Sequence, residues 1–171
     1  MSNRPDGRPW LLIDIDGVLN PSLSNREGAE LGIRVSHAHD EHGRRWRMLL
    51  RPEHGQWLLG MTDVFQLAWC TTWQDLANTR IGPRIGLPKL PVVAFDFSSA
   101  ADGPSKVPGI LRHVGRDPFC WLDDDVWPVD RTHLSGIPNP HTVIEVDPNE
   151  GLLPKHLAHA RSWAERLPPP A

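Results

Sequence analysis

The sequence predicts an α/β fold, with a mainly parallel sheet and helices on both of its faces. Short apolar runs alternate with amphipathic segments along most of the 171 residues, which is the pattern of βαβ units. Runs such as Leu11–Ile13 are apolar on both sides of a strand, as is typical of strands between two helical layers. No repeat or linker interrupts the pattern, so we expect one domain over residues 1–171.

The expected elements follow from these two patterns. Strands are expected at Trp10–Ile15, Val64–Cys70, Pro91–Phe95, Phe119–Asp123 and Thr142–Val146. Helices are expected where apolar residues recur at helical spacing, at Glu53–Met61, Trp73–Arg80, Val107–Val114 and Pro154–Leu167. The prolines of the tail 168–171 cannot continue the last helix, so we expect a frayed end.

The segment 20–51 breaks the alternation. Two extended pieces, Gly32–His37 and Arg45–Leu50, flank the polar turn Asp40–Gly43, which predicts a β-hairpin flap. The histidines of this segment are His37, His39 and His42. They could bind a transition metal, but we favour the interpretation that they form a solvated polar tip.

Composition excludes some classes of protein. The formal net charge of −3 shows no general basic surface for nucleic acid or for an anionic membrane. Cys70 and Cys120 lie in apolar runs without metal-type spacing, which favours buried free thiols over a disulfide. The first apolar run is short and contains Asp14, and no run reaches the roughly 20 apolar residues of a membrane span. We therefore expect a cytoplasmic protein with no membrane partner.

Polar residues follow three of the expected strands. They are Asp14 and Asp16 after the first strand, Thr71 and Thr72 after the second, and Asp123, Asp124 and Asp125 after the fourth. The carboxyl ends of parallel strands meet at one edge of a sheet, so these groups should converge. Asp125 is the member of its group that we expect to cap a helix.

Two further features favour an anion at this edge. Thr72 and Asp75 fit a capping box, so a helix N-terminus would direct free N–H groups toward the site. Lys106 stands just before another expected helix and would add a cation. Carboxylates with a metal on one side, and a hydroxyl, a helix end and a lysine on the other, suit a phosphate group.

The carboxylates of Asp14 and Asp16 come from one strand end. Two such groups repel each other unless a cation lies between them, which implies a divalent metal, a proton-transfer pair, or both. An Asp-Gly turn without function is the alternative. A calcium loop fits poorly, because Val18 stands where an oxygen ligand is needed.

The run from Asp14 to Val18 (Asp-Ile-Asp-Gly-Val) resembles the first motif of the haloacid dehalogenase-like (HAD) superfamily of phosphohydrolases. Thr71 is similar to the second-motif hydroxyl residue, Lys106 to the third-motif lysine, and Asp123–Asp124 to the fourth-motif acid pair. The match runs from about Trp10 to Asp125. It implies a Rossmann-like HAD fold of the small, capless type.

The resemblance implies a phosphatase that acts through an aspartyl-phosphate. Asp14 would be the nucleophile, and Asp16 would be the general acid and then the base. Mg²⁺ would be held by Asp14, by the backbone carbonyl of Asp16 and by Asp123 or Asp124. An aspartate at the position of Asp16 separates the phosphatases of the superfamily from its dehalogenases.

The phosphoryl oxygens would be bound by Thr71 and Lys106, with Thr72 as the second candidate hydroxyl. A helix cap is the alternative for either threonine, and an ordinary surface lysine is the alternative for Lys106.

The segment after Asp16 is long enough for a flap but too short for a large cap, so the site should be open. An open site suits a phosphate on a macromolecule or on a nucleic-acid end, which flap arginines such as Arg44 and Arg47 would grip. The competing hypothesis is a catalytically weak phosphate-binding or interaction module that retains the fold.

Overall fold

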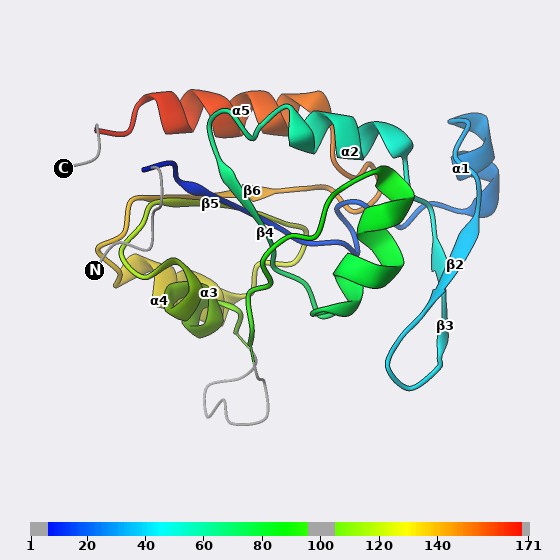
Figure 1. Ribbon diagram of the computed structural model, residues 1–171, viewed down its shortest axis with the longest axis horizontal. Helices are drawn as coiled ribbons and strands as arrows, with labels where there is room; N and C mark the ends of the chain where they lie inside the picture. Colours follow the sequence, from blue (N-terminus) through cyan, green and yellow to red (C-terminus); the bar gives the residue numbers. More distant parts are fainter. Residues whose placement is uncertain (1–6, 96–104, 169–171) are drawn as a thin grey trace.

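The computed structural model describes residues 7–95 and 105–168 of this α/β protein (Figure 1). The helices and strands, in chain order, are β1 (Trp10–Ile13), α1 (Asn25–Glu30), β2 (Ser36–His39), β3 (Arg45–Met48), α2 (Pro52–Leu59), β4 (Gln66–Trp69), η1 (a π-helix, Ala77–Ile81), η2 (a 3-10 helix, Gly82–Ile85), α3 (Val107–Val114), β5 (Phe119–Asp123), α4 (Pro128–Ser135), β6 (His141–Glu145) and α5 (Pro154–Glu165). The main sheet has four parallel strands in the order β4-β1-β5-β6, which confirms the expected parallel sheet.

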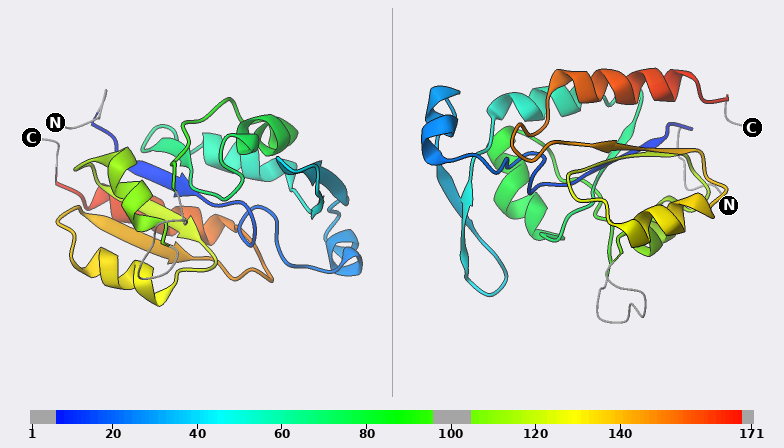
Figure 2. Two further views of the ribbon diagram at one scale, coloured as in Figure 1. Left: turned by 90° about the horizontal axis from the view of Figure 1, so that it is seen from below. Right: turned by 180° about the vertical axis from the view of Figure 1, so that it is seen from behind.

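The sheet lies between two helical layers. Helices α2 and α5 lie on one side of it, and α3 and α4 lie on the other (Figures 1 and 2). Leu11 and Ile13 pack into the core cluster on the α5 side, whereas Leu12 packs into the cluster on the α3 side. Because side chains alternate along a strand, the continuous apolar run of β1 supplies both layers at once.

The strands β2 and β3 form a separate antiparallel pair, in which Ser36 lies opposite Met48 and His39 lies opposite Arg45. This β2–β3 hairpin projects beyond the end of the sheet at which β1 ends (Figures 1 and 2). The hairpin predicted from the sequence is confirmed, although both strands are shorter than expected. Its turn closes where the Asp40 side chain accepts hydrogen bonds from the N–H groups of His42 and Arg44.

Two expected elements are wrong. The segment Pro91–Phe95 is not a strand, because only Val92 forms a bridge, to Trp69 at the edge of β4. Pro91 has no N–H to extend a ladder. The other expected strands and the helices in α2, α3 and α5 are present. The bounds of β5 and α3 are those expected, whereas the ends of the others are shifted. Helices α1 and α4 were not expected, and Pro169–Ala171 of the expected tail lie outside the described residues.

The second error concerns Trp73–Arg80. No α-helix begins at Thr72, and the capping box with Asp75 is absent; turns lead instead into the π-helix η1. Gln74 has a φ of +47°, which interrupts regular helix geometry. The resulting sharp turn lets the indole of Trp73 hydrogen-bond with Asp16.

The two cysteines are free and buried, as expected. Burial raises the pKa of both the Cys70 and the Cys120 thiols, so they pack as small apolar groups. None of the helices in the described ranges is both long and apolar enough to cross a membrane.

Candidate active site

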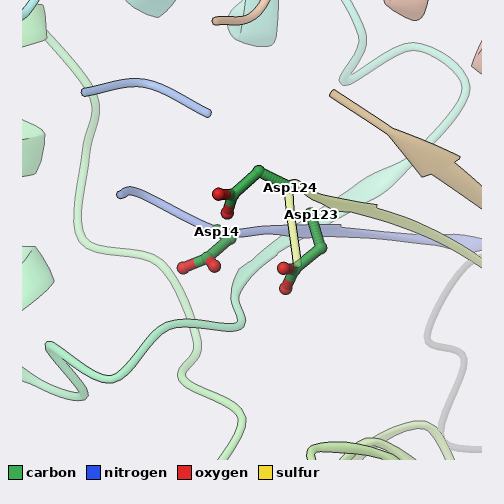
Figure 3. Close-up of side chains that lie close together, drawn as sticks. All are labelled: Asp14, Asp123 and Asp124. Carbon is green, nitrogen blue, oxygen red and sulfur yellow. The ribbon is translucent and has the colours of Figure 1, made fainter. Parts of the chain in front are cut away.

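The carboxyl ends of β1 and β5 bring the predicted acidic residues together. Ile13 pairs with Leu122 on one side and with Trp69 on the other. The N–H of Asp14 then donates to the carbonyl of Leu122 at 3.1 Å. Asp14 and Asp123 therefore leave neighbouring strands at the same level, with Asp124 beside them (Figure 3).

Lys106 lies between two of these carboxylates. Its Nζ donates to Asp14 Oδ2 and to Asp123 Oδ2, each at 2.7 Å, and lies 3.4 Å from the carbonyl oxygen of Cys70. The side chains of Lys106, Asp14 and Asp123 are only 13%, 10% and 1% exposed. Because the pairs are buried and hydrogen-bonded, they are much more strongly coupled than surface ion pairs.

Burial and mutual repulsion set the charges of this cluster. Burial lowers the pKa of Lys106, but its attraction to Asp14 and Asp123 outweighs burial and raises the pKa above its ordinary value. Burial and then the charge of Asp14 raise the pKa of Asp123 to about 7, although Lys106 acts in the opposite direction. Burial and Asp14 likewise raise the pKa of Asp124 to about 6. One ammonium thus leaves the carboxylates incompletely neutralised.

Gly17 makes room for Asp124. Its φ is +74°, and a Cβ at this position would lie 2.1 Å from the Asp124 carboxyl group. Only glycine satisfies both conditions, because other residues rarely adopt this φ and would collide with the carboxylate. The loop after Asp14 therefore lets the acid from β5 approach closely.

These carboxylates suit a hard divalent cation. Among the described residues, Asp14, Asp123 and Asp124 are the one set of three metal-type side chains whose ligand atoms lie within 4.8 Å of one another. All three donors are carboxylate oxygens, which Mg²⁺ prefers. Each carboxylate also keeps lone pairs beyond those used by Lys106. The histidines His37, His39 and His42 form no such set.

Asp16 lies in a different environment, although it is only two residues from Asp14. Its side chain is exposed. Its Oδ2 accepts from Trp73 Nε1 and its Oδ1 from Asn20 Nδ2, each at 2.9 Å. Asn20 also bonds with the carbonyl of Arg47 and the N–H of Leu49. Asn20 therefore connects Asp16 to the β2–β3 hairpin.

A second layer of hydrogen bonds fixes the backbone at Lys106. Asp130 Oδ1 accepts from the N–H of Lys106 at 3.1 Å and from the hydroxyl of Ser105 at 2.7 Å. Its Oδ2 accepts from the N–H of Trp127, just before α4. Asp130 thus joins the start of α4 to the residue that carries the ammonium.

Two cavities meet at Asp16 and Thr72, which line both of them. The first cavity, which we call the acidic-cluster cavity, has a volume of about 410 Å³ and includes Asp14, Lys106 and Asp124 in its lining. The second, which we call the hairpin cavity, has a volume of about 420 Å³ and lies between the hairpin turn and the loop after β4.

Only some of the predicted site residues thus lie together in the structure. Asp14, Lys106, Asp123 and Asp124 lie together, and Asp16 stands at the boundary of the two cavities. Thr72 lines both cavities, whereas Thr71 is fully buried and its hydroxyl accepts from the N–H of Trp73 at 3.4 Å. The expected helix N-terminus as an anion pocket is wrong, because no α-helix begins there. The N–H of Asp125 donates to Asp123 Oδ1. Among the described residues, no contact is observed in which the Asp125 side chain caps a helix.

Sequence reasoning missed the roles of Asn20 and Asp130 and did not predict the hydrogen bond from Trp73 to Asp16. Asp130 carried a signal, because it follows Pro128 in a pattern typical of a first helical turn. The roles of Asn20 and Trp73 depend on contacts across the fold, which no local pattern indicates.

Comparisons of the chain with protein-family models, with curated proteins and with solved structures found no match.

Proposed function

We propose that the chain is a Mg²⁺-dependent phosphomonoester hydrolase that acts through an aspartyl-phosphate. The observation that carries the proposal is the contrast between Asp14 and Asp16. Asp14 is buried beside Lys106 and two further acids, while Asp16 is exposed and held by N–H donors. Such a division suits a nucleophile and a separate proton carrier.

In the first step, an Asp14 carboxylate oxygen attacks phosphorus and the bond from phosphorus to the leaving oxygen breaks. Asp16 gives its proton to that oxygen, so an alcohol departs. In the second step, Asp16 takes a proton from water, whose oxygen attacks the phosphorus of the aspartyl-phosphate. Inorganic phosphate is released, and Asp14 returns as a carboxylate.

Lys106 has two roles in this scheme. Its ammonium orients Asp14 through the 2.7 Å hydrogen bond, and it offers positive charge close to the phosphoryl oxygens. Oxygen atoms of Asp14, Asp123 and Asp124 would hold Mg²⁺, which supplies further positive charge to the phosphoryl group when bound.

The test uses p-nitrophenyl phosphate and three proteins: wild type, Asp14→Asn and Asp16→Asn. Wild-type turnover should require Mg²⁺ and stop with a chelator. Asp14→Asn should lose turnover and form no phosphorylated protein, because the amide is not a nucleophile. Asp16→Asn should still be phosphorylated, since nitrophenolate needs no proton, but should release phosphate about 10²–10⁴-fold more slowly.

The measurements are nitrophenolate release and the intact mass of the acid-quenched protein, with circular dichroism as the folding control. Accumulation of a phosphate adduct in Asp16→Asn but not in Asp14→Asn would support both roles. Unchanged turnover in Asp14→Asn would refute the nucleophile. Phosphate binding without turnover in the folded wild type would favour a binding module.

A further inference from the structure

We infer that the hairpin cavity receives the leaving group of the substrate, and that it selects small organic phosphates whose leaving group carries a protonated amine. This inference rests on the proposed phosphatase activity and adds the substrate class. The cavity lies between the hairpin turn and the loop after β4, and has room for an organic group of about 420 Å³.

Its position follows from Asp16. This residue lines both the acidic-cluster cavity and the hairpin cavity. The proton carrier must face the oxygen that joins phosphorus to the leaving group. With the phosphoryl group beside Asp14 and Lys106, the rest of the substrate extends past Asp16 into the hairpin cavity.

The lining of the hairpin cavity is acidic and aromatic. Besides Asp16, it includes the carboxyl groups of Asp40, Glu41 and Asp75 and the indoles of Trp46 and Trp73. No lysine or arginine is among the described residues that line it, and His42 is the one basic side chain there. A protonated amine gains from the carboxylates and from the indole ring of Trp73, whereas an anionic group is repelled.

Trp46 already binds a cation within the protein. The guanidinium carbon of Arg44 lies 4.3 Å from the centroid of the Trp46 ring. The same indole donates from Nε1 to Asp40 Oδ2 at 2.9 Å, which fixes its orientation. Arg44 therefore occupies one face of the Trp46 ring, so on the hairpin side the carboxylates of Asp40 and Glu41 are the groups that attract an amine.

The hairpin and the proton carrier belong to one hydrogen-bonded unit. Asn20 bonds at once with Asp16, with the carbonyl of Arg47 in β3 and with the N–H of Leu49 just after β3. A leaving group bound against Trp46 and Glu41 is thereby placed in a constant relation to Asp16. Such positioning is what raises the rate of proton transfer.

The same observations disfavour a polynucleotide. Several arginines of the segment are engaged within it: Arg26 with Glu30, Arg45 with His37, and Arg47 with Asn25 and the carbonyl of Leu23. Neighbouring phosphates of a nucleic acid would meet Glu41 and Asp75 at the cavity instead of free cations.

The test compares three benzyl phosphates that differ at the para position: aminomethyl, methyl and carboxylate. The substituent is distant from the scissile bond, so its charge is the main difference between the substrates. We expect kcat/KM for the aminomethyl compound to exceed that of the methyl compound by about tenfold, and the carboxylate compound to be the poorest. The preference should weaken in 1 M salt, because salt screens exposed charges.

The variant Glu41→Gln/Asp75→Asn should reduce the ratio of aminomethyl to methyl toward one. Glu165→Gln, which removes an exposed charge at the end of α5, is the matched control and should keep the wild-type ratio. Hydrolysis of the methyl compound by the double variant shows that it is folded.

Equal kcat/KM for the three compounds, or an unchanged ratio in the double variant, would overturn the inference while leaving the phosphatase intact. A 5′-phosphorylated oligonucleotide hydrolysed faster than the aminomethyl compound would overturn it in favour of a nucleic-acid end. Absence of hydrolysis of every compound would overturn both this inference and the proposed function.

Discussion

The two sides of the candidate site are built differently. On the sheet side, Asp14 and Asp123 are buried and the side chain of Lys106 is 13% exposed. Asp123 ends β5, and Asp14 directly follows the neighbouring parallel strand β1. On the hairpin side, Asp16 and Trp46 are exposed. Asp16 is held by hydrogen bonds from Asn20 and Trp73, and the indole of Trp46 in β3 donates to Asp40. The first group rests on a buried four-stranded sheet, whereas the second rests on one exposed strand pair and a few side-chain contacts.

Under the proposed function, this difference would separate the reaction from the choice of substrate. A phosphoryl group presents the same charges whatever alcohol it is attached to, so the proposed chemistry can be placed on the rigid sheet. Leaving groups differ, and loops and hairpins can change without disturbing a core. The two sides should therefore respond differently to substitution.

The largest expected effect is the loss of Lys106. Lys106→Met should destabilise the fold by about 3–5 kcal/mol, because it leaves the buried carboxylates of Asp14 and Asp123 without their cation. It should also abolish the proposed phosphatase activity. Urea unfolding measures the stability, and the added variant Asp123→Asn should recover part of the loss, since one of the repelling charges is then gone.

A surface pair gives the contrast on the hairpin side. Arg26 and Glu30 of α1 form a 2.9 Å ion pair with side chains that are 89% and 60% exposed. Arg26→Met should change the unfolding midpoint very little, because exposed pairs are screened by water and salt. Equal destabilisation by the two substitutions would contradict the distinction between a buried and an exposed side.

A second prediction concerns pH on the buried side. His54 of α2 is buried and bonds through Nε2 with the carbonyl of Leu152 at 3.1 Å. Burial lowers its pKa from 6.5 to about 4. As the pH falls, His54 therefore binds a proton in the unfolded chain before it does so in the folded chain. The contribution of His54 to the free energy of unfolding should be fully present above about pH 6.5 and should decrease down to about pH 4.

The full contribution is about 3 kcal/mol, by linkage of the two pKa values. It is measured as the free energy of unfolding at pH 7.5, 5.5 and 4.5. In His54→Gln, which keeps an N–H donor, the decrease in the free energy of unfolding with falling pH should be smaller by the contribution of His54. Parallel pH profiles for the two proteins would show that His54 is not the group responsible.

Local patterns predicted the sheet side better than the hairpin side. The apolar run before Asp14 and the run before Asp123 indicated buried parallel strands, and parallel strands must end at one edge. The turn after Thr71 could not be predicted in this way. The turn places the indole of Trp73 against Asp16, a partner distant in the sequence. Tertiary contacts of this kind override local helix signals.

The third prediction compares two glycines with nearly the same φ angle. Gly17 has a φ of +74° and Gly43 a φ of +76°, but a Cβ would strike the Asp124 carboxyl group only at Gly17, with nothing within 4 Å at Gly43. Gly43→Ala should cost about 1 kcal/mol from backbone strain alone. Gly17→Ala should cost about 1–3 kcal/mol and also displace Asp124.

Displacement of Asp124 should appear as weaker metal binding. The Mg²⁺ concentration for half-maximal activity should therefore rise in Gly17→Ala and stay at the wild-type value in Gly43→Ala. If this Mg²⁺ concentration rose equally in both variants, the close approach of Gly17 to Asp124 would not be needed for metal binding.

The smallest expected effect concerns the indole that holds Asp16. Trp73→Phe keeps an aromatic ring but removes the Nε1 donor that lies 2.9 Å from Asp16 Oδ2. We expect kcat/KM for an alkyl phosphate to fall about tenfold, because Asp16, the proposed proton carrier, loses one of its two observed N–H partners. For p-nitrophenyl phosphate, whose leaving group needs no proton, the phosphorylation step should be nearly unchanged.

Trp163→Phe, where the ring stacks on Phe65, is the control and should slow the hydrolysis of neither substrate. If Trp73→Phe lowered kcat/KM equally for both substrates, Trp73 would support the fold of the loop and not the orientation of Asp16.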